Sequence, residues 1–373
     1  MSIVIFIIIL AVLILAHESG HFLAAKKAGV RVDEFGLGFP PRLWAKKYGE
    51  TEYSINLIPL GGFVKIYGED PDEESIAGTD SKRSLTSKSK WIQAWVLFAG
   101  VFFNFLLAWL LISTGLTFGL PASESALPAG GTLKNAALTI TEVLPNSPAD
   151  KAGIKIGDRV MSLTDEKTSL TDLTSDGFRT FISGGGEREL LLAVSRPDGE
   201  PTSTNTIFRI RPEAGVVAGG KPAIGVALDR VGTLRLPFYS AIWKGFFYTV
   251  SLAWATISAI YLMFAGAFRG DNSLLSSVTG PVGLVGLVGS MAGLGWAWVL
   301  NLTAVISINL AVLNLVPFPA LDGGRLFFLL IEAIKGKRIT PRVANLTNSV
   351  GFILLMVLML VITYRDIVRL FVS

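Results

Sequence analysis

Long apolar runs, separated by shorter polar stretches, dominate the pattern of this sequence. They occupy residues 3–25, 91–123, 246–268, 278–298, 299–316 and 350–363. About 20 apolar residues cross the hydrocarbon core of a bilayer as a helix, so several of these runs are long enough to do so. Hydrophobic residues make up 51% of the chain and charged residues 17%. We therefore predict a polytopic α-helical membrane protein with about four transmembrane helices.

Basic residues suggest the orientation of the first run. Only Met1 and Ser2 precede it, so the positive segment that begins a signal peptide is missing. Lys26 and Lys27 follow the run instead, and a second basic cluster surrounds Lys335 to Arg342. Both places are expected at the cytoplasmic side, with the N-terminus outside. The net charge of +4 gives no reason to expect a nucleic-acid partner.

The run at residues 246–268 has two interpretations. Its length and composition suit a transmembrane helix. However, if the segment around Asp322 is to meet the first run from the same side, residues 236–298 must cross the membrane an even number of times. Either 246–268 lies along the outer interface or re-enters, or it pairs with 278–298 as two crossings. We favour the interfacial interpretation.

Strand-like patterns appear between the first two apolar runs. Residues 52–58 and 62–66 alternate in polarity, and the Pro-Leu-Gly-Gly sequence at 59–62 is typical of a turn. We predict a membrane-associated β-hairpin on the cytoplasmic side. An exposed edge there would bind an extended substrate by strand addition, through Gly61, Gly62 and Phe63. The alternative is an ordinary surface hairpin.

Residues 126–231 are richer in Pro, Gly, Ser, Thr and charge, and they predict one small β-rich soluble domain. Strand-like runs occur at 138–144, 159–163, 190–196 and 206–211. Residues 147–160 resemble the part of PDZ domains where a short helix leads through a Gly-Asp turn into a strand. Such a domain binds chain ends or extended strands, or it acts only as a steric filter. The expected division is 1–125, 126–231 and 232–373.

The candidate chemistry begins inside the first apolar run, at His17-Glu18-Ser19-Gly20-His21. On a helix, His17 and His21 share a face and can bind one metal ion, while Glu18 reaches a water beside it. The chain has two histidines in total, and both lie in this motif. The alternative is a pair of histidines that only hydrogen-bond to neighbouring helices. Because the chain has no cysteine, a zinc site must use His, Asp or Glu.

A lone carboxylate late in the chain suits the remaining ligand position. Asp322 ends an apolar stretch that contains Pro317 and Pro319. A carboxylate at membrane depth needs a cation, and a catalytic zinc site has three protein ligands. The alternative is an aspartate that caps a helix at the interface. Farther back, Asn104 follows Gly100 by four residues, and it suits either a contact between helices or a place near the site.

Taken together, these motifs resemble the site-2 protease family of intramembrane zinc metalloproteases, in the bacterial regulator of sigma-E protease branch that cleaves anti-sigma factors. The resemblance rests on HESGH, residues 30–39, the stretch 58–65, the PDZ-like insert, and the Asn-x-x-Pro-x-Pro-x-Leu-Asp-Gly pattern at 314–323. It implies one Zn²⁺ per chain, bound by His17, His21 and Asp322, with Glu18 as general base. It also implies that Asn314 and Asn104 line the substrate cleft. This chain has room for one PDZ domain, whereas some members carry two, and Val101 stands where the family often has proline.

The expected function is hydrolysis of a peptide bond in or beside a transmembrane segment, in the bacterial inner membrane. The expected substrates are single-pass proteins such as anti-sigma factors, or signal-peptide remnants, cut first outside by a site-1 protease. Cleavage would occur toward the cytoplasmic side, with the PDZ domain outside. The alternatives are a non-catalytic PDZ-bearing scaffold, which has no need of Glu18, and a metal transporter, which needs ionisable groups along a path across the bilayer.

Overall fold

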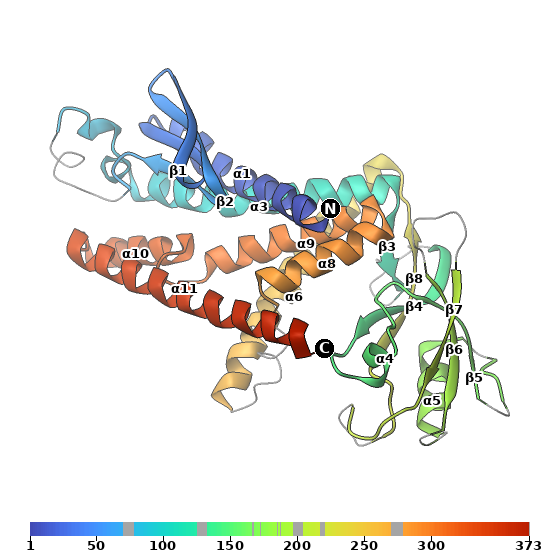
Figure 1. The fold of residues 1–373 in the computed structure, drawn as a ribbon. Coiled ribbons are helices and arrows are strands. Elements are labelled where there is room, and N and C mark those ends of the chain that lie inside the picture. Colours follow the sequence, from blue (N-terminus) through green and yellow to red (C-terminus); the bar gives the residue numbers. More distant parts are fainter. Residues whose placement is uncertain are drawn as a thin grey trace. The chain divides into compact units, whose positions relative to one another are not determined.

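The structure is a computed structural model of the chain. It describes residues 1–69, 78–124, 133–165, 168–171, 173–184, 186, 188–196, 204–216, 221–269 and 279–372. The described chain forms two compact units (Figure 1). The first comprises Met1–Leu111, Phe246–Val285 and Leu302–Asp366, and the second comprises Ile112–Gly245, Gly286–Asn301 and Ile367–Ser373. The predicted boundary at residues 125 and 126 lies outside the described residues.

Helices form a large part of the chain, and the longest of them follow the predicted apolar runs. They are α1 (Ser2–Lys27), α3 (Lys90–Phe118), α6 (Phe238–Phe268), α8 (Pro281–Leu294), α9 (Trp296–Leu315), α10 (Asp322–Lys335) and α11 (Pro341–Val372). Two short 3₁₀ turns, Ser81–Arg83 and Leu85–Ser87, precede α3. Within the described residues, α1, α3, α6, α9 and α11 contain the five segments long and apolar enough to cross a membrane. The chain is thus a multi-pass helical membrane protein with β elements.

Helix α6 contains the apolar run at residues 246–268, for which the sequence allowed two interpretations. By length and composition it suits a crossing. The next helix, α8, has 14 residues and is therefore only about 21 Å long, which is short for a hydrocarbon core about 30 Å thick. If the chain crossed the membrane twice between α3 and α9, α8 would have to be one of the two transmembrane helices. The interfacial placement of α6 therefore stays our prediction.

The predicted hairpin is present, but its pairing differs from the prediction. Strand β1 (Val32–Tyr48) pairs with β2 (Thr51–Ile66), and both runs predicted to pair with each other lie within β2. They lie on opposite sides of β1, because Glu34 is opposite both Lys65 and Glu52. The first part of β1 lies between the two runs and pairs with both of them. Local sequence patterns do not reveal this pairing. Within the described chain, residues 62–66 pair only with β1, so they form an edge.

The second unit contains a six-stranded antiparallel sheet. Its strands are β3 (Leu120–Ser123), β4 (Lys134–Val143), β5 (Arg159–Thr164), β6 (Leu190–Arg196), β7 (Thr204–Ile210) and β8 (Val226–Leu234), in the order β3-β8-β4-β5-β6-β7. All four strand-like runs predicted from the sequence are strands here. Helices α4 (Pro148–Lys151) and α5 (Ser175–Gly184) accompany them.

Residues 147–160 adopt the predicted sequence of short helix, turn and strand. Ser147 caps α4 by accepting a hydrogen bond from the Asp150 amide, and Gly157 has a φ of 94°. Asp158 is fully buried and accepts hydrogen bonds from the Arg196 guanidinium at 2.7 and 2.6 Å. This charge-assisted pair fixes the turn to β6.

Candidate metal centre and active site

The two histidines lie on the face of α1 that packs against α3. His21 is 7% exposed, and its Nδ1 donates a hydrogen bond to the carbonyl of Val96 at 2.9 Å. Since a carbonyl only accepts, Nδ1 carries the proton, and the Nε2 of a neutral ring presents a lone pair. The helices are close at this level, because a Cβ on Gly100 would lie 2.7 Å from Cε1 of His17 and closer to Nε2 of His21.

The third candidate ligand comes from the first residue of α10. After α9 ends, the chain turns through Pro317, Phe318 and Pro319, and prolines cannot extend a regular helix. Gly323 and Gly324 then lie against backbone carbonyls of this turn, where a Cβ would overlap Val316 O and Phe318 O. This tight return of the chain places Asp322 beside the histidines of α1.

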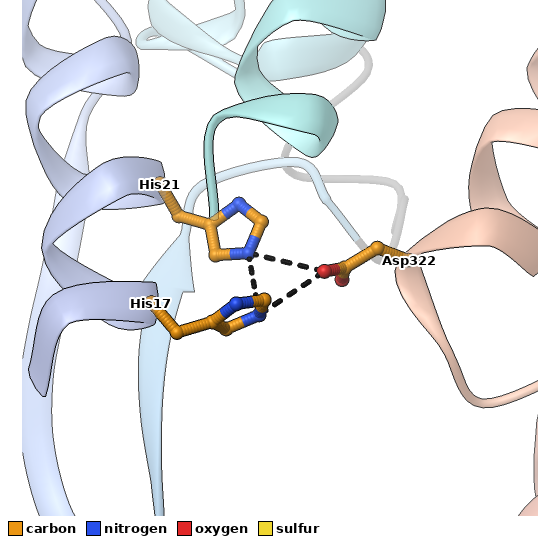
Figure 2. A group of neighbouring side chains, drawn as sticks. All are labelled: His17, His21 and Asp322. Atoms are coloured by element: carbon orange, nitrogen blue, oxygen red, sulfur yellow. Dashed lines mark hydrogen bonds and ion pairs between the residues drawn. The ribbon is translucent and has the colours of Figure 1, made fainter. Parts of the chain in front are cut away.

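Three potential ligand atoms form a nearly regular triangle (Figure 2). His17 Nε2 lies 3.2 Å from His21 Nε2 and 3.1 Å from Asp322 Oδ2, and His21 Nε2 lies 3.4 Å from the same oxygen. Ligands about 2.0–2.1 Å from a tetrahedral zinc ion are about 3.3–3.4 Å apart. The triangle therefore has the dimensions of three corners of a zinc tetrahedron.

The electrostatics of the triangle also fit a cation. Asp322 Oδ2 is buried, and no hydrogen-bond donor satisfies it within the described part of the chain. By contrast, the buried carboxylate of Asp366 accepts a hydrogen bond from the Gly283 amide at 2.9 Å. A buried carboxylate oxygen beside two imidazole nitrogens is costly unless a positive charge lies between them. The donor set of two imidazoles and one carboxylate is one that zinc uses.

Glu18 lies at the cavity in front of these ligands. The cavity has a volume of about 770 Å³ and is lined by His17, Glu18, His21, Asp322 and the stretch from Gly62 to Glu69, among others. Edge residues 62–66 therefore lie beside the candidate ligands. A Cβ on Gly62 would lie 2.5 Å from Ile14 Cγ2 and 3.3 Å from Glu18 Cγ, so glycine allows the strand to approach α1.

The predicted substrate-binding residues have different positions. Gly62 and Phe63 line the cavity, whereas Gly61 lies against the ring of Phe39. Asn104 is 1% exposed, and its Nδ2 lies 3.3 Å from Nδ1 of His17. It is thus behind the histidine and outside the cavity lining. Asn314 is half-buried in the last turn of α9 and is also absent from the residues described as lining the cavity.

Sequence analysis did not identify two further features of the site. The Val96 carbonyl that orients His21 is a backbone group, so it has no sequence signature. Arg325, one turn after Asp322 on α10, lines the cavity and forms an ion pair with Glu69 at the end of the hairpin. The i, i+3 spacing from Asp322 to Arg325 was a usable signal, because such residues share a helix face.

The sequence is similar to those of known peptidases. The sequence profile of peptidase family M50 matches residues 5–358. A Clostridium perfringens protein whose name places it among the zinc metalloproteases is 35% identical over 368 residues, 99% of each chain. The regulator of sigma-W protease RasP of Bacillus subtilis is 30% identical over 447 residues, again 99% of each chain. Zinc metalloprotease RasP of Oceanobacillus iheyensis is 29% identical over 450 residues, with the same coverage.

Proposed function

The chain belongs to peptidase family M50 and is a zinc-dependent metalloendopeptidase of the site-2 type, and we propose that His17, His21 and Asp322 bind its single zinc ion. The observation that carries this proposal is the triangle of ligand atoms with edges of 3.1–3.4 Å around an unsatisfied carboxylate oxygen. These three residues would hold the ion and, as in other catalytic zinc sites, would leave one coordination position for the reaction.

Glu18 is the proposed general base. Bound zinc supplies Lewis-acid activation of the peptide carbonyl and of water. The Glu18 carboxylate accepts the proton that the attacking water loses and transfers it to the departing amide nitrogen. Its place on α1, directly after one ligand and among the residues lining the cavity, suits this transfer. Asn314, at the end of α9, is proposed to hold the substrate strand or the developing oxyanion.

The hairpin edge is the proposed binding site for the peptide. A helical segment hides its carbonyls in its own hydrogen bonds, so a transmembrane substrate must unwind before it is cut. Residues 62–66 form an edge beside the ligands and line the cavity. An unwound substrate stretch would add to this edge as a strand, contacting Gly61, Gly62 and Phe63.

The site assignment is tested with purified protein and a model transmembrane substrate. Glu18→Gln should retain one zinc ion per chain and lose cleavage by about 10²- to 10⁴-fold, because the base is removed and the ligands remain. Chelator should abolish cleavage by the wild-type protein, and added zinc should restore it. Cleavage by Glu18→Gln at the wild-type rate would contradict the mechanism.

The proposed substrates are single-pass membrane proteins, including anti-sigma factors and signal-peptide remnants. One relative is named a regulator of sigma-W protease, which is compatible with substrates of this kind. The protein would reside in the bacterial inner membrane, cut toward the cytoplasmic side, and release a cytoplasmic fragment. A first protease would act before it on the outer part of the substrate.

The six-stranded unit is proposed to be an extracytoplasmic PDZ domain that reads the trimmed substrate. Its turn at Gly157 and Asp158 has the expected form. Ser175 at the start of α5 donates a hydrogen bond to Leu228 O at 3.1 Å, so this helix lies beside β8. A peptide strand adds to an exposed sheet edge, and within the described residues Val226 to Arg230 of β8 pair with β4 and not with β3.

A further inference from the structure

We propose that Asn104 is a positioning residue for the metal centre: its side-chain oxygen accepts a hydrogen bond from His17 Nδ1 and thereby directs His17 Nε2 at the zinc ion. This inference rests on the proposed ligand role of His17. It assigns Asn104 to the metal centre, whereas sequence analysis expected the residue to line the substrate cleft.

The argument begins with the contact behind His17. Asn104 lies on α3, and its Nδ2 is 3.3 Å from His17 Nδ1. The Oδ1 of the same amide is buried and has no hydrogen-bond partner within the described chain. In this orientation the amide points a donor at the ring and leaves a buried acceptor without a hydrogen bond, which costs about 1–3 kcal/mol.

The protonation of His17 decides which amide atom should face the ring. A neutral imidazole carries one proton, and a ring that binds metal through Nε2 carries it on Nδ1. A protonated Nδ1 donates, so the group facing it must be an acceptor. The amide oxygen and nitrogen have nearly the same shape, and their assignment follows from the hydrogen-bond network. Rotating the amide by 180° brings Oδ1 to His17 Nδ1, so that the ring proton faces an acceptor, and it places Nδ2 where Oδ1 had been.

The two histidines then have equivalent support from α3. His21 Nδ1 donates to the Val96 carbonyl, and His17 Nδ1 donates to the Asn104 amide, two turns farther along the same helix. Metal-binding histidines are commonly oriented by an acceptor at the other ring nitrogen. The backbone of Asn104 is itself held, because its carbonyl accepts a hydrogen bond from Ser307 Oγ on α9 at 2.8 Å.

Two substitutions separate this role from helix packing. Asn104→Asp keeps an acceptor toward His17 Nδ1 and loses the amide donor, whereas Asn104→Leu keeps the approximate size and loses both. The matched control is Asn309→Leu on α9, where the amide oxygen accepts a hydrogen bond from Thr256 Oγ1 at 2.8 Å. All three variants are purified in detergent, and their zinc affinity is measured by competition with a chromogenic chelator.

We expect Asn104→Leu to weaken zinc binding by about 10- to 100-fold and Asn104→Asp to retain it. Replacing zinc with Co²⁺ gives a second readout, because the visible spectrum of Asn104→Asp should match that of the wild type. The control Asn309→Leu should leave zinc affinity unchanged. Thermal unfolding of each metal-free variant identifies any general loss of folding.

Two outcomes would overturn the inference. Wild-type zinc affinity in Asn104→Leu would mean that the amide does not orient His17. Weak zinc binding in Asn104→Asp, with unfolding unchanged, would mean that the nitrogen faces the ring. The variants His17→Ala, His21→Ala and Asp322→Ala test the proposed function separately, since full zinc binding by any of these would refute the ligand set whatever Asn104 does.

Discussion

At the scale of single residues, the geometry of the site depends on glycines as well as on the proposed ligands. Gly100 leaves room for both imidazoles, Gly62 lets the hairpin edge reach Glu18, and Gly323 lets the turn after α9 close tightly. None of these three has a positive φ, so the requirement for glycine at each is one of space. Each position is therefore a sensitive test of the geometry.

Gly100→Ala should remove most zinc binding and cleavage, because the new methyl group would occupy the space of His21 Nε2. The measurements are zinc content after purification and cleavage of the model substrate. Gly286→Ala on α8 is the control, since a Cβ there meets nothing within 4 Å. Full zinc content in Gly100→Ala would show that α1 and α3 are farther apart than described.

Ala320 adds a second residue-scale prediction. Its φ is 74°, a left-handed conformation that costs a non-glycine residue about 1–2 kcal/mol, and it lies two residues before Asp322. Ala320→Gly should bind zinc as well as the wild type, whereas Ala320→Val should bind it more weakly because a branched side chain resists this conformation. Chelator competition measures both, and equal affinities would contradict the described turn.

At the scale of elements, the hairpin is tied to its surroundings by ion pairs around its tip. Glu50, between β1 and β2, accepts hydrogen bonds from Lys26 at the end of α1 and from Arg83, each at 2.6 Å. These two hydrogen bonds hold the pKa of the Glu50 carboxyl below its ordinary value. Because the groups are partly exposed, each pair contributes about 1 kcal/mol or less.

This gives a pH-dependent prediction. A carboxyl whose pKa is lower in the folded state stabilises the protein above its unfolded pKa, and the contribution disappears as pH falls through the folded pKa. Glu50→Gln should therefore unfold at a lower temperature than the wild type at pH 7. The difference should shrink steadily once the pH drops below about 4.3, the ordinary value for glutamate. A difference that is constant with pH would assign the effect to something other than the charge.

The elements also mark where sequence reasoning succeeds and where it stops. Apolar length predicted the long helices, and alternation with turn residues predicted β4 to β7, because these signals are local. The pairing of residues 52–58 and 62–66 with β1 is non-local. The alternating pattern therefore predicted the strands correctly, but the prediction that they pair with each other was wrong. HESGH and Asp322 were recognisable by residue type, whereas Asn104's contact with His17 depends on how α3 packs against α1.

At the scale of the whole molecule, we expect the proposed PDZ domain to make cleavage depend on prior trimming of the substrate. A chain that lacks residues 126–231 should cut full-length substrate that has not been trimmed, because nothing excludes its outer part. The wild type should cut only the trimmed form. Gel electrophoresis measures cleavage of both substrates by both enzymes. The control is the shortened chain with the substitution Glu18→Gln. If the shortened chain cuts only the trimmed substrate, residues 126–231 do not exclude the untrimmed form.

The separation of the ligands along the chain has a consequence for biogenesis. His17 and His21 lie in the first helix, and Asp322 follows roughly three hundred residues later. During translation, the two histidines are therefore synthesised long before the aspartate. With the three proposed ligands, a product that ends before Asp322 lacks one of them, so we expect it to have no hydrolytic activity.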